Sequence, residues 1–269
     1  MHLVNQAFNW LIETSLVLTW VVMFAITAIA GDLGFRLGRR RADRVKVDDT
    51  ARSTIGTLVA AMVTLLAFAM GLTISFAQGR FEQRRDLVVQ EANAIGTAWL
   101  RAGLFDAPHG PALRATIEDY TSVRLDYLLT TDRDRLRVIL QRTNTLQGEI
   151  WQSVDAIVRQ RPDAVASSLV ASVNEMIDLS LSQRFAFANR VPIYLLWSVF
   201  LGSMLSIGAM QFQFGIARQR QPVLTGLLLF MWTGALILII DLNRPRIGGL
   251  TIDPSPIVWT LEGFKPAPK

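Results

Sequence analysis

Four stretches of the chain are strongly apolar and almost free of charge. They run over about residues 12–35, 54–78, 192–217 and 222–242. Each is long enough to cross a bilayer, because about 20 residues of helix span the roughly 30 Å hydrocarbon core. Pro192 and Pro222 stand at the start of the third and fourth stretches, where a proline in the first helical turn costs little. The pattern predicts an all-α membrane protein with four transmembrane helices.

The polar region between the second and third stretches shows a different pattern. Its apolar residues recur at spacings of three and four, with charged residues between them, which is typical of helices that bury one face in a bundle. Four such stripes follow one another: Phe81, Val88, Ala92, Ile95 and Trp99; Leu113, Ile117, Tyr120, Val123 and Tyr127; Leu136, Ile139, Thr143, Leu146, Ile150, Val154 and Ile157; Val165, Leu169, Val173, Met176 and Leu179. We therefore expect an extramembrane helical bundle between the second and third spans.

The patterns divide the chain into five parts. Residues 1–53 form an N-terminal segment, with a possible short amphipathic helix over 1–12, the first span and a basic loop. The second span, 54–78, is followed by the bundle, 79–191, and by the third and fourth spans within 192–242. In the last part, residues 243–269, the density of Pro and Gly predicts an irregular tail rather than a helix.

Composition narrows the chemistry. The chain has no cysteine and two histidines in 269 residues. Disulfides, thiol catalysis and Cys-ligated metals are therefore excluded, and a His-based metal site or triad within one chain is not expected. No span carries a charge near its middle, and Asp32 and Asp241 lie near span ends, whereas proton relays and ion-coupled transporters usually need ionisable groups deeper in the membrane. We expect no enzyme activity, cofactor or metal.

The basic residues predict an orientation. Lys and Arg in short loops favour the cytoplasmic side of a bilayer. Seven of them lie within residues 36–53 and two, Arg218 and Arg220, lie in the loop between the third and fourth spans. In the long bundle, acidic and basic residues are equal in number. The rule places both loops in the cytoplasm, and both termini and the bundle in the periplasm of a bacterial inner-membrane protein. Basic residues beside spans also account for the net charge of +5 without a nucleic-acid partner.

The second span carries two distinct rows. Gly56, Ala60, Thr64, Ala67, Gly71, Ser75 and Gln78 form a row of small and mildly polar residues. Such a row favours close helix–helix packing, and a pore lining is the alternative. Thr64, Phe68, Leu72 and Phe76 form a bulkier row. This second row fits lipid or core contact, or a hydrophobic constriction that gates by dewetting.

Three arginines, Arg80, Arg84 and Arg85, begin where the second span ends. They could anchor the helix at the head groups, since arginine side chains reach toward the interface while their stems stay in apolar surroundings. Around the axis of an oligomer, the same residues would instead form a basic ring at a pore mouth.

The segment "AMGLTISFAQGRFEQRRDLVVQEANAIGTAWLRAGL" resembles the bacterial bestrophin-like family of unknown function. That family has an apolar helix that runs into a basic segment and then into an "EANAIGTAYLRA"-type motif. The residues that carry this resemblance are Arg80, Arg84, Arg85, Glu91, Ala92, Asn93, Gly96, Thr97, Leu100 and Arg101. The segment "DLNRPRIGG" is similar to the family's ending through Asp241, Leu242, Arg244, Pro245 and Gly248.

A more distant resemblance leads to the bestrophins themselves, which are pentameric anion channels or, in some bacteria, cation channels. Their second helix lines the pore and ends in an Arg-Trp-Trp-Glu-x-Arg pattern. Arg80 and Arg85 match its arginines, whereas Gln83 replaces its glutamate. The resemblance implies a constriction at Thr64, Phe68 and Leu72. It also implies a homo-oligomer, with the pentamer of the bestrophins as the expected form, that passes small ions, with anions favoured. Bestrophins place their helical domain in the cytoplasm, opposite to the orientation that the loop charges predict.

Three functions follow from these patterns. A bestrophin-like oligomeric ion channel in the bacterial inner membrane is the leading hypothesis. A non-catalytic membrane receptor or scaffold with a helical sensor domain is the alternative, although no kinase, phosphodiesterase or coiled-coil output module is present. A membrane enzyme fits least, because the chain lacks cysteine, has few histidines and has no carboxylate in the middle of a span.

Overall fold

The computed structural model describes residues 15–45 and 48–265. Its regular elements are helices, and no strand occurs in the described residues. They are α2 (Leu16–Arg44), α3 (Asp49–Ala102), α4 (His109–Leu129), α5 (Arg133–Gln160), α6 (Ala164–Ala188), α7 (Ile193–Ala217), α8 (Pro222–Leu242) and α9 (Ser255–Gly263). The predicted all-α class is confirmed. The amphipathic helix predicted for residues 1–12 lies outside the described residues.

The chain forms two compact units. The membrane unit comprises Met1–Gly79 and Val191–Arg244, and the extramembrane unit comprises Arg80–Arg190 and Pro245–Lys269. Helix α3 is continuous across the junction at residues 79–80. Four segments of the described chain are long and apolar enough to cross a membrane; they contain α2, α3, α7 and α8. The chain is therefore a multi-pass membrane protein.

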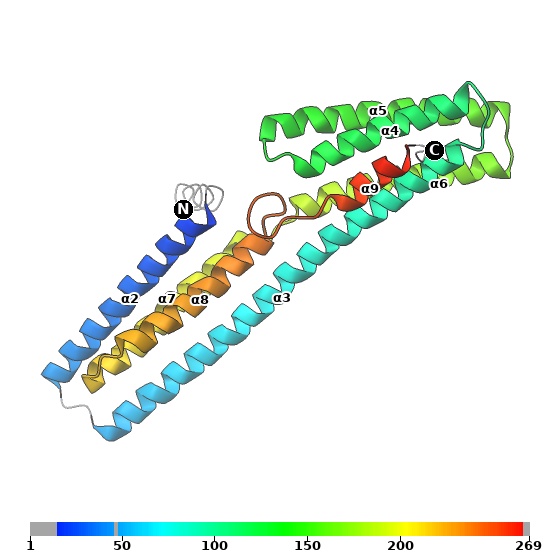
Figure 1. Ribbon diagram of the computed structural model, residues 1–269. Helices are drawn as coiled ribbons and strands as arrows, with labels where there is room; N and C mark the ends of the chain where they lie inside the picture. The colour runs from blue at the N-terminus through cyan, green and yellow to red at the C-terminus, as the bar shows by residue number, and fades with distance from the viewer. Residues whose placement is uncertain (1–14, 46–47, 266–269) are drawn as a thin grey trace. The chain divides into compact units, whose positions relative to one another are not determined.

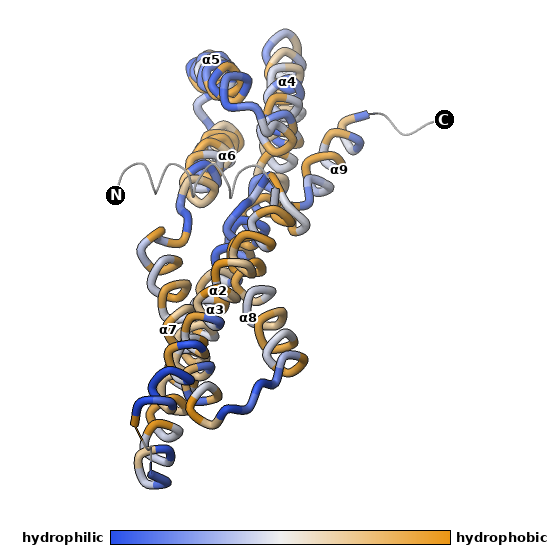
Figure 2. The backbone as a smooth tube through the Cα atoms, turned by 90° about the vertical axis from the view of Figure 1, so that its left-hand side faces the viewer, coloured by the Kyte–Doolittle hydropathy of each residue, from blue (hydrophilic) through white to orange (hydrophobic). Residues whose placement is uncertain are grey.

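In the membrane unit, α2, α7 and α8 run side by side (Figure 1). Figure 2 shows that α7 and α8 are mostly hydrophobic along their length, whereas their short connection is hydrophilic. Polar side chains join the helices at a few points. Trp20 of α2 donates a hydrogen bond to Thr233 of α8 at 3.0 Å, and Trp232 of α8 donates to Ser203 of α7 at 2.7 Å. These hydrogen bonds fix the orientation of the helices within an interface that is otherwise apolar.

Glycines allow α2 and α7 to approach closely. A Cβ atom on Gly34 would overlap the backbone carbonyl of Gly208, and one on Gly38 would overlap that of Phe212. From the other side, a Cβ on Gly215 would overlap the carbonyl of Phe35. Backbone-to-backbone contact of this kind requires residues without side chains. The close helix pair of the membrane unit is thus α2–α7.

Replacing Gly34 with Ala is expected to separate α2 from α7 and to lower sharply the yield of monodisperse protein in mild detergent. The backbone carbonyl that the new methyl group would meet cannot move away as a flexible side chain could. Gly234→Ala in α8 is the matched control, because no atom lies within 4 Å of its Cβ position. Size-exclusion chromatography of both variants measures the effect. Equal yields from the two variants would contradict this account of the pair.

The extramembrane unit contains the second part of α3, together with α4, α5, α6 and α9. Asp132 and Asp163 begin α5 and α6, each accepting hydrogen bonds from backbone N–H groups of the first turn, as N-cap residues do. The core is built from the predicted stripes. Its fully buried members include Val88, Ile95, Leu113, Ile117, Tyr120, Leu146, Ile150, Leu169, Val173 and Met176. The stripes therefore become the mutual contact faces of the bundle.

The last part of the chain differs from the prediction. Residues 243–269 were expected to be irregular, but Ser255–Gly263 form α9. Pro254 and Pro256 flank its first residue, and proline fits this position because the first N–H groups of a helix have no intrahelical partner. Ile257 of α9 is fully buried in the extramembrane core. The tail therefore adds an apolar contact to that core.

Candidate functional site

The membrane part of α3 has two contrasting faces. One face is buried within the chain through Val59, Leu66, Met70, Thr73 and Ala77. The other carries the row predicted as a constriction. Thr64 is exposed, and the side chains of Phe68 and Leu72 are 65% and 44% exposed. This bulky row thus has little contact with the other helices of its own chain.

The small-residue row of the same span is also turned outward. Ala60, Ala67, Gly71, Ser75 and Gln78 are exposed. No atom lies within 4 Å of a Cβ placed on Gly71. Gly56, at the start of the row, lies against the Gln213 side chain of α7, 2.8 Å from its Cβ position to Nε2, but the exposed members of the row face away from the other described helices, and the backbone-to-backbone contact of the unit is between α2 and α7 instead. These exposed members remain available to neighbouring molecules or to a pore.

The three arginines after the span have different surroundings. Arg84 is fully buried, and it donates hydrogen bonds to the carbonyls of Ala186 at 2.9 Å and of Asn189 at 2.8 Å. Arg80 donates to the side chain of Asn189 at 2.6 Å. Both cations thereby meet the C-terminal end of α6, where backbone carbonyls lack helical partners and the helix dipole favours positive charge. Arg85, by contrast, is exposed.

Further along α3, the motif residue Glu91 forms a buried ion pair with Arg124 of α4. Arg124 Nε lies 2.5 Å from Glu91 Oε1, Arg124 Nη2 lies 3.1 Å from Oε2, and both side chains are 1% exposed. Arg124 Nη2 also donates to Gln183 Oε1 of α6 at 2.5 Å. The two-point contact matches the planar guanidinium to the carboxylate. Glu91, Arg124 and Gln183 therefore tie three helices together inside the unit.

Electrostatics in this core follow from burial. Burial raises the pKa of the Tyr120 phenol to about 12, and the negative charge of Glu91 adds to the rise. Burial alone would lower the pKa of Arg124, but the charge and hydrogen bonds of Glu91 outweigh it, so the pKa is raised. At neutral pH, Tyr120 is neutral and Arg124 is charged. The network is thus a structural ion pair of Glu91 with a charged Arg124, beside a neutral phenol.

The other motif residues on α3 have varied positions. Arg101 donates a hydrogen bond to the carbonyl of Ser168 in α6 at 2.7 Å. Asn93 is exposed, and a Cβ on Gly96 would meet no atom within 4 Å. Arg101 therefore holds α6, whereas Asn93 and Gly96 lie where the chain itself makes few contacts.

The second motif follows α8. Asp241 and Arg244 are 8% and 6% exposed, and the backbone N–H of Arg244 donates to the carbonyl of Asp241 at 2.9 Å. Asn243 accepts a hydrogen bond from the backbone N–H of Val191 at 2.7 Å. Pro245 is buried, and its carbonyl accepts from Ile252. This motif closes α8 with a hydrogen-bonded turn and joins it to the residues before α7.

Two residues of this region were missed by the sequence analysis. Arg124 sits on the buried stripe side of α4, and nothing in its local sequence marks it as the partner of Glu91. The guanidinium of Arg246 lies 4.5 Å from the ring centroid of Tyr127 and 4.8 Å from that of Phe187. The only local mark of Arg246 is that it is the second arginine of the segment "NRPR". Among the described residues, no group of three or more His, Asp or Glu side chains is placed to hold a metal ion.

The fold and this network define a class of protein: a multi-pass, all-helical membrane protein whose second transmembrane helix continues into an extramembrane helical unit. Residues 17–257 match the family described as the Bestrophin-like domain. The chain therefore belongs to the bestrophin-like family. No curated protein matches the chain.

Solved structures agree with this fold. A point-mutant form of a bacterial bestrophin homolog from Klebsiella pneumoniae is 13% identical, with a TM-score of 0.67 and coverage of 93% of this chain and 97% of that chain. Another form of that homolog, solved by Zn-SAD phasing, is 14% identical, with a TM-score of 0.62 and coverage of 93% and 96%. At this level of identity the likeness extends to the fold.

Proposed function

We propose that this protein is a homo-oligomeric ion channel of the bacterial inner membrane, without enzymatic activity, whose pore is lined by the exposed face of α3. One observation carries the proposal. The row of Thr64, Phe68 and Leu72, which is bulky and apolar at its last two positions, faces away from the chain's own described helices, although the opposite face of the same helix is packed. When several copies surround an axis, such a row forms a hydrophobic constriction that ions cross only when it is wet. Membership of the bestrophin-like family supports this arrangement, with a pentamer as the expected ring.

The arginines after the row favour anions. In the proposed ring, Arg85 presents its charge at the pore mouth. Arg80 and Arg84 are hydrogen-bonded to the end of α6, and from beneath the pore surface their charges add to the positive potential at the mouth. Fixed positive charge near a pore entrance raises the local concentration of anions. Glu91 and Arg101 are then supporting residues that hold α3 against α4 and α6, and Asp241, Arg244 and Pro245 support the end of α8. Asn93 and Gly96 lie where the chain itself makes few contacts and have no supporting role within it.

Anion flux through reconstituted wild-type protein tests the function. Liposomes that contain purified protein and an iodide-sensitive dye are exposed to an inward iodide gradient. We expect quenching faster than in protein-free liposomes. A rate equal to that of empty liposomes in wild type and in variants with a widened constriction would contradict the channel. It would then favour a receptor or scaffold.

We also propose that the basic loops lie in the cytoplasm and that the extramembrane unit lies in the periplasm, as the loop charges predict. Because the protein has no native cysteine, single cysteines can report the topology. Arg40 and Gln152 are both exposed positions, in α2 and α5. In intact cells, an impermeant thiol reagent is expected to label Gln152→Cys and to spare Arg40→Cys. The reverse pattern would place the extramembrane unit in the cytoplasm.

A further inference from the structure

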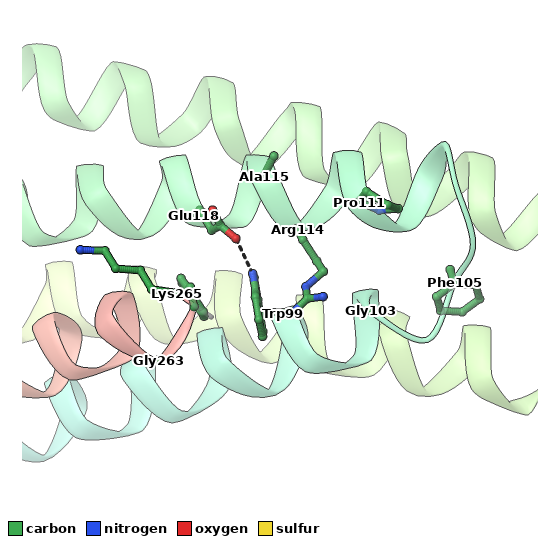
Figure 3. A pocket seen from close by; sticks show the side chains of 10 residues that line it. Trp99, Gly103, Phe105, Pro111, Arg114, Ala115, Glu118, Gly263 and Lys265 are labelled. Atoms are coloured by element: carbon green, nitrogen blue, oxygen red, sulfur yellow. Dashed lines mark hydrogen bonds between the residues drawn. The ribbon is translucent and has the colours of Figure 1, made fainter. Parts of the chain in front are cut away.

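A pocket of about 610 Å³ lies within the extramembrane unit (Figure 3). It is bounded by the end of α3, the first half of α4 and the residues that follow α9. Its chemically distinctive lining residues are Trp99, Phe105, Arg114, Glu118, Phe264 and Lys265. The volume lies in the range typical of pockets that bind small molecules, roughly 300–1,000 Å³. The channel proposal assigns no role to this pocket.

Arg114 is the central group of the pocket. Its guanidinium carbon lies 3.3 Å from the ring centroid of Trp99, a cation–π contact. Its Nε atom is shielded from solvent and has no hydrogen-bond partner, and within the described part of the chain no carboxylate forms an ion pair with it. Most other buried or half-buried arginines of this unit donate hydrogen bonds to carbonyls or carboxylates, as Arg84, Arg101 and Arg124 do. Arg114 thus retains donors for an anion that is not part of the described chain.

The surroundings hold this cation in place. Trp99 donates a hydrogen bond to Glu118 at 2.8 Å and stacks on Phe264, with ring centroids 4.7 Å apart. The lone acid of the lining is thereby engaged with Trp99, as Figure 3 shows. A Cβ on Gly103 would lie 3.2 Å from Nη1 of Arg114, so the glycine leaves room for the guanidinium. The site therefore combines a positioned guanidinium with a wall of aromatic rings.

We infer that the pocket binds a small organic carboxylate that carries an apolar or aromatic body. The planar guanidinium of Arg114 offers paired N–H donors that match a carboxylate in two-point geometry. Both faces of the Trp99 ring are occupied, by Arg114 and by Phe264, so the apolar body lies against the lining surfaces of Phe105, Pro111 and Ala115. Two cations, Arg114 and Lys265, against one engaged acid, Glu118, favour a ligand with a single negative charge. A bare inorganic anion would leave this apolar lining unused.

Binding of benzoate to the detergent-solubilised full chain tests this inference. We expect a dissociation constant on the order of 1 mM for so small a ligand, measured by saturation-transfer NMR. Benzylamine, which has the same ring and the opposite charge, and inorganic phosphate are expected to bind at least about tenfold more weakly. Arg114→Gln is expected to weaken benzoate binding about tenfold. Arg137→Gln, which removes an exposed arginine of α5 outside the pocket, is the matched control.

If Arg114→Gln does not fold, Arg114→Lys replaces it in this test. The lysine keeps the positive charge but lacks the planar guanidinium, so this variant too is expected to bind benzoate about tenfold more weakly than wild type. Benzoate binding unchanged in the Arg114 variants would overturn the inference. So would benzylamine or phosphate binding as tight as that of benzoate. A further variant lacks residues 266–269, which follow Lys265. Binding that appears only in that variant would mean that the pocket serves the chain's own end, and would also overturn it.

Discussion

Phe68→Ala is expected to raise ion flux through the reconstituted protein on the order of tenfold, which corresponds to a barrier lower by about 1.4 kcal/mol. Phe68 and Leu72 lie one helical turn apart on the exposed face of α3. In the proposed ring their side chains narrow the axis and disfavour a continuous column of water. Removing the phenyl ring widens and wets that point. Leu72→Ala is expected to change flux in the same direction.

Leu227→Ala is the matched control for this experiment. Leu227 is an apolar residue of α8 that is 57% exposed in the single chain, and the proposal gives it no contact with the pore. Ion flux through Leu227→Ala should equal that through wild type. Phe68→Ala, Leu72→Ala and Leu227→Ala should all keep the oligomer mass of wild type. Loss of assembly in Phe68→Ala, with no flux, would instead show that Phe68 packs in a core, where its removal costs about 3–5 kcal/mol. That result would contradict the constriction.

Glu91→Ala is expected to destabilise the extramembrane unit by about 3–5 kcal/mol, because it leaves the buried Arg124 without its counter-charge. The pair is 1% exposed on both sides, and Arg124 keeps only Gln183 as a side-chain hydrogen-bond acceptor after the change. The apparent melting temperature in detergent should fall on the order of 10 °C. Circular dichroism at increasing temperature measures the fall.

Asp155→Ala is the control for Glu91→Ala, since it removes an ion pair of similar chemistry at the surface. Asp155 and Arg159 of α5 are 55% and 77% exposed, and exposed ion pairs contribute little to stability because water screens them. Replacing Glu91 and Arg124 together with Met should cost less than Glu91→Ala alone, because no buried charge remains unpaired. Equal melting temperatures of Glu91→Ala and Asp155→Ala would contradict the assigned role of the buried pair.

Local periodicity was sufficient to predict the helices of the bundle between the second and third spans and their buried faces. Val88, Leu113, Ile150 and Met176, one from each predicted stripe, are fully buried in the core of the extramembrane unit. Their burial was predictable because apolar residues recur at spacings of three and four within a single helix. Gly31, Gly34 and Gly38, which mark the close contact of α2 with α7, also recur at spacings of three and four, so this contact was within reach of the same pattern.

Long-range polar contacts could not be predicted in this way. Glu91 meets Arg124, 33 residues away, and Arg84 meets the end of α6, about 100 residues away. Each contact depends on how the helices pack, which a single sequence does not show. The helix α9 was missed for a different reason. The prolines beside Ser255 read as breakers, whereas at the start of a helix they are compatible with it.

The direct test of the central claim is the structure of the assembled protein viewed along its axis, from electron cryo-microscopy of the purified protein in lipid nanodiscs. The proposed channel predicts a closed ring of identical chains with α3 innermost and with Phe68 and Leu72 lining the narrowest part of a central path. A monomer, or a dimer without a central path and with the Phe68 row facing lipid, would contradict it.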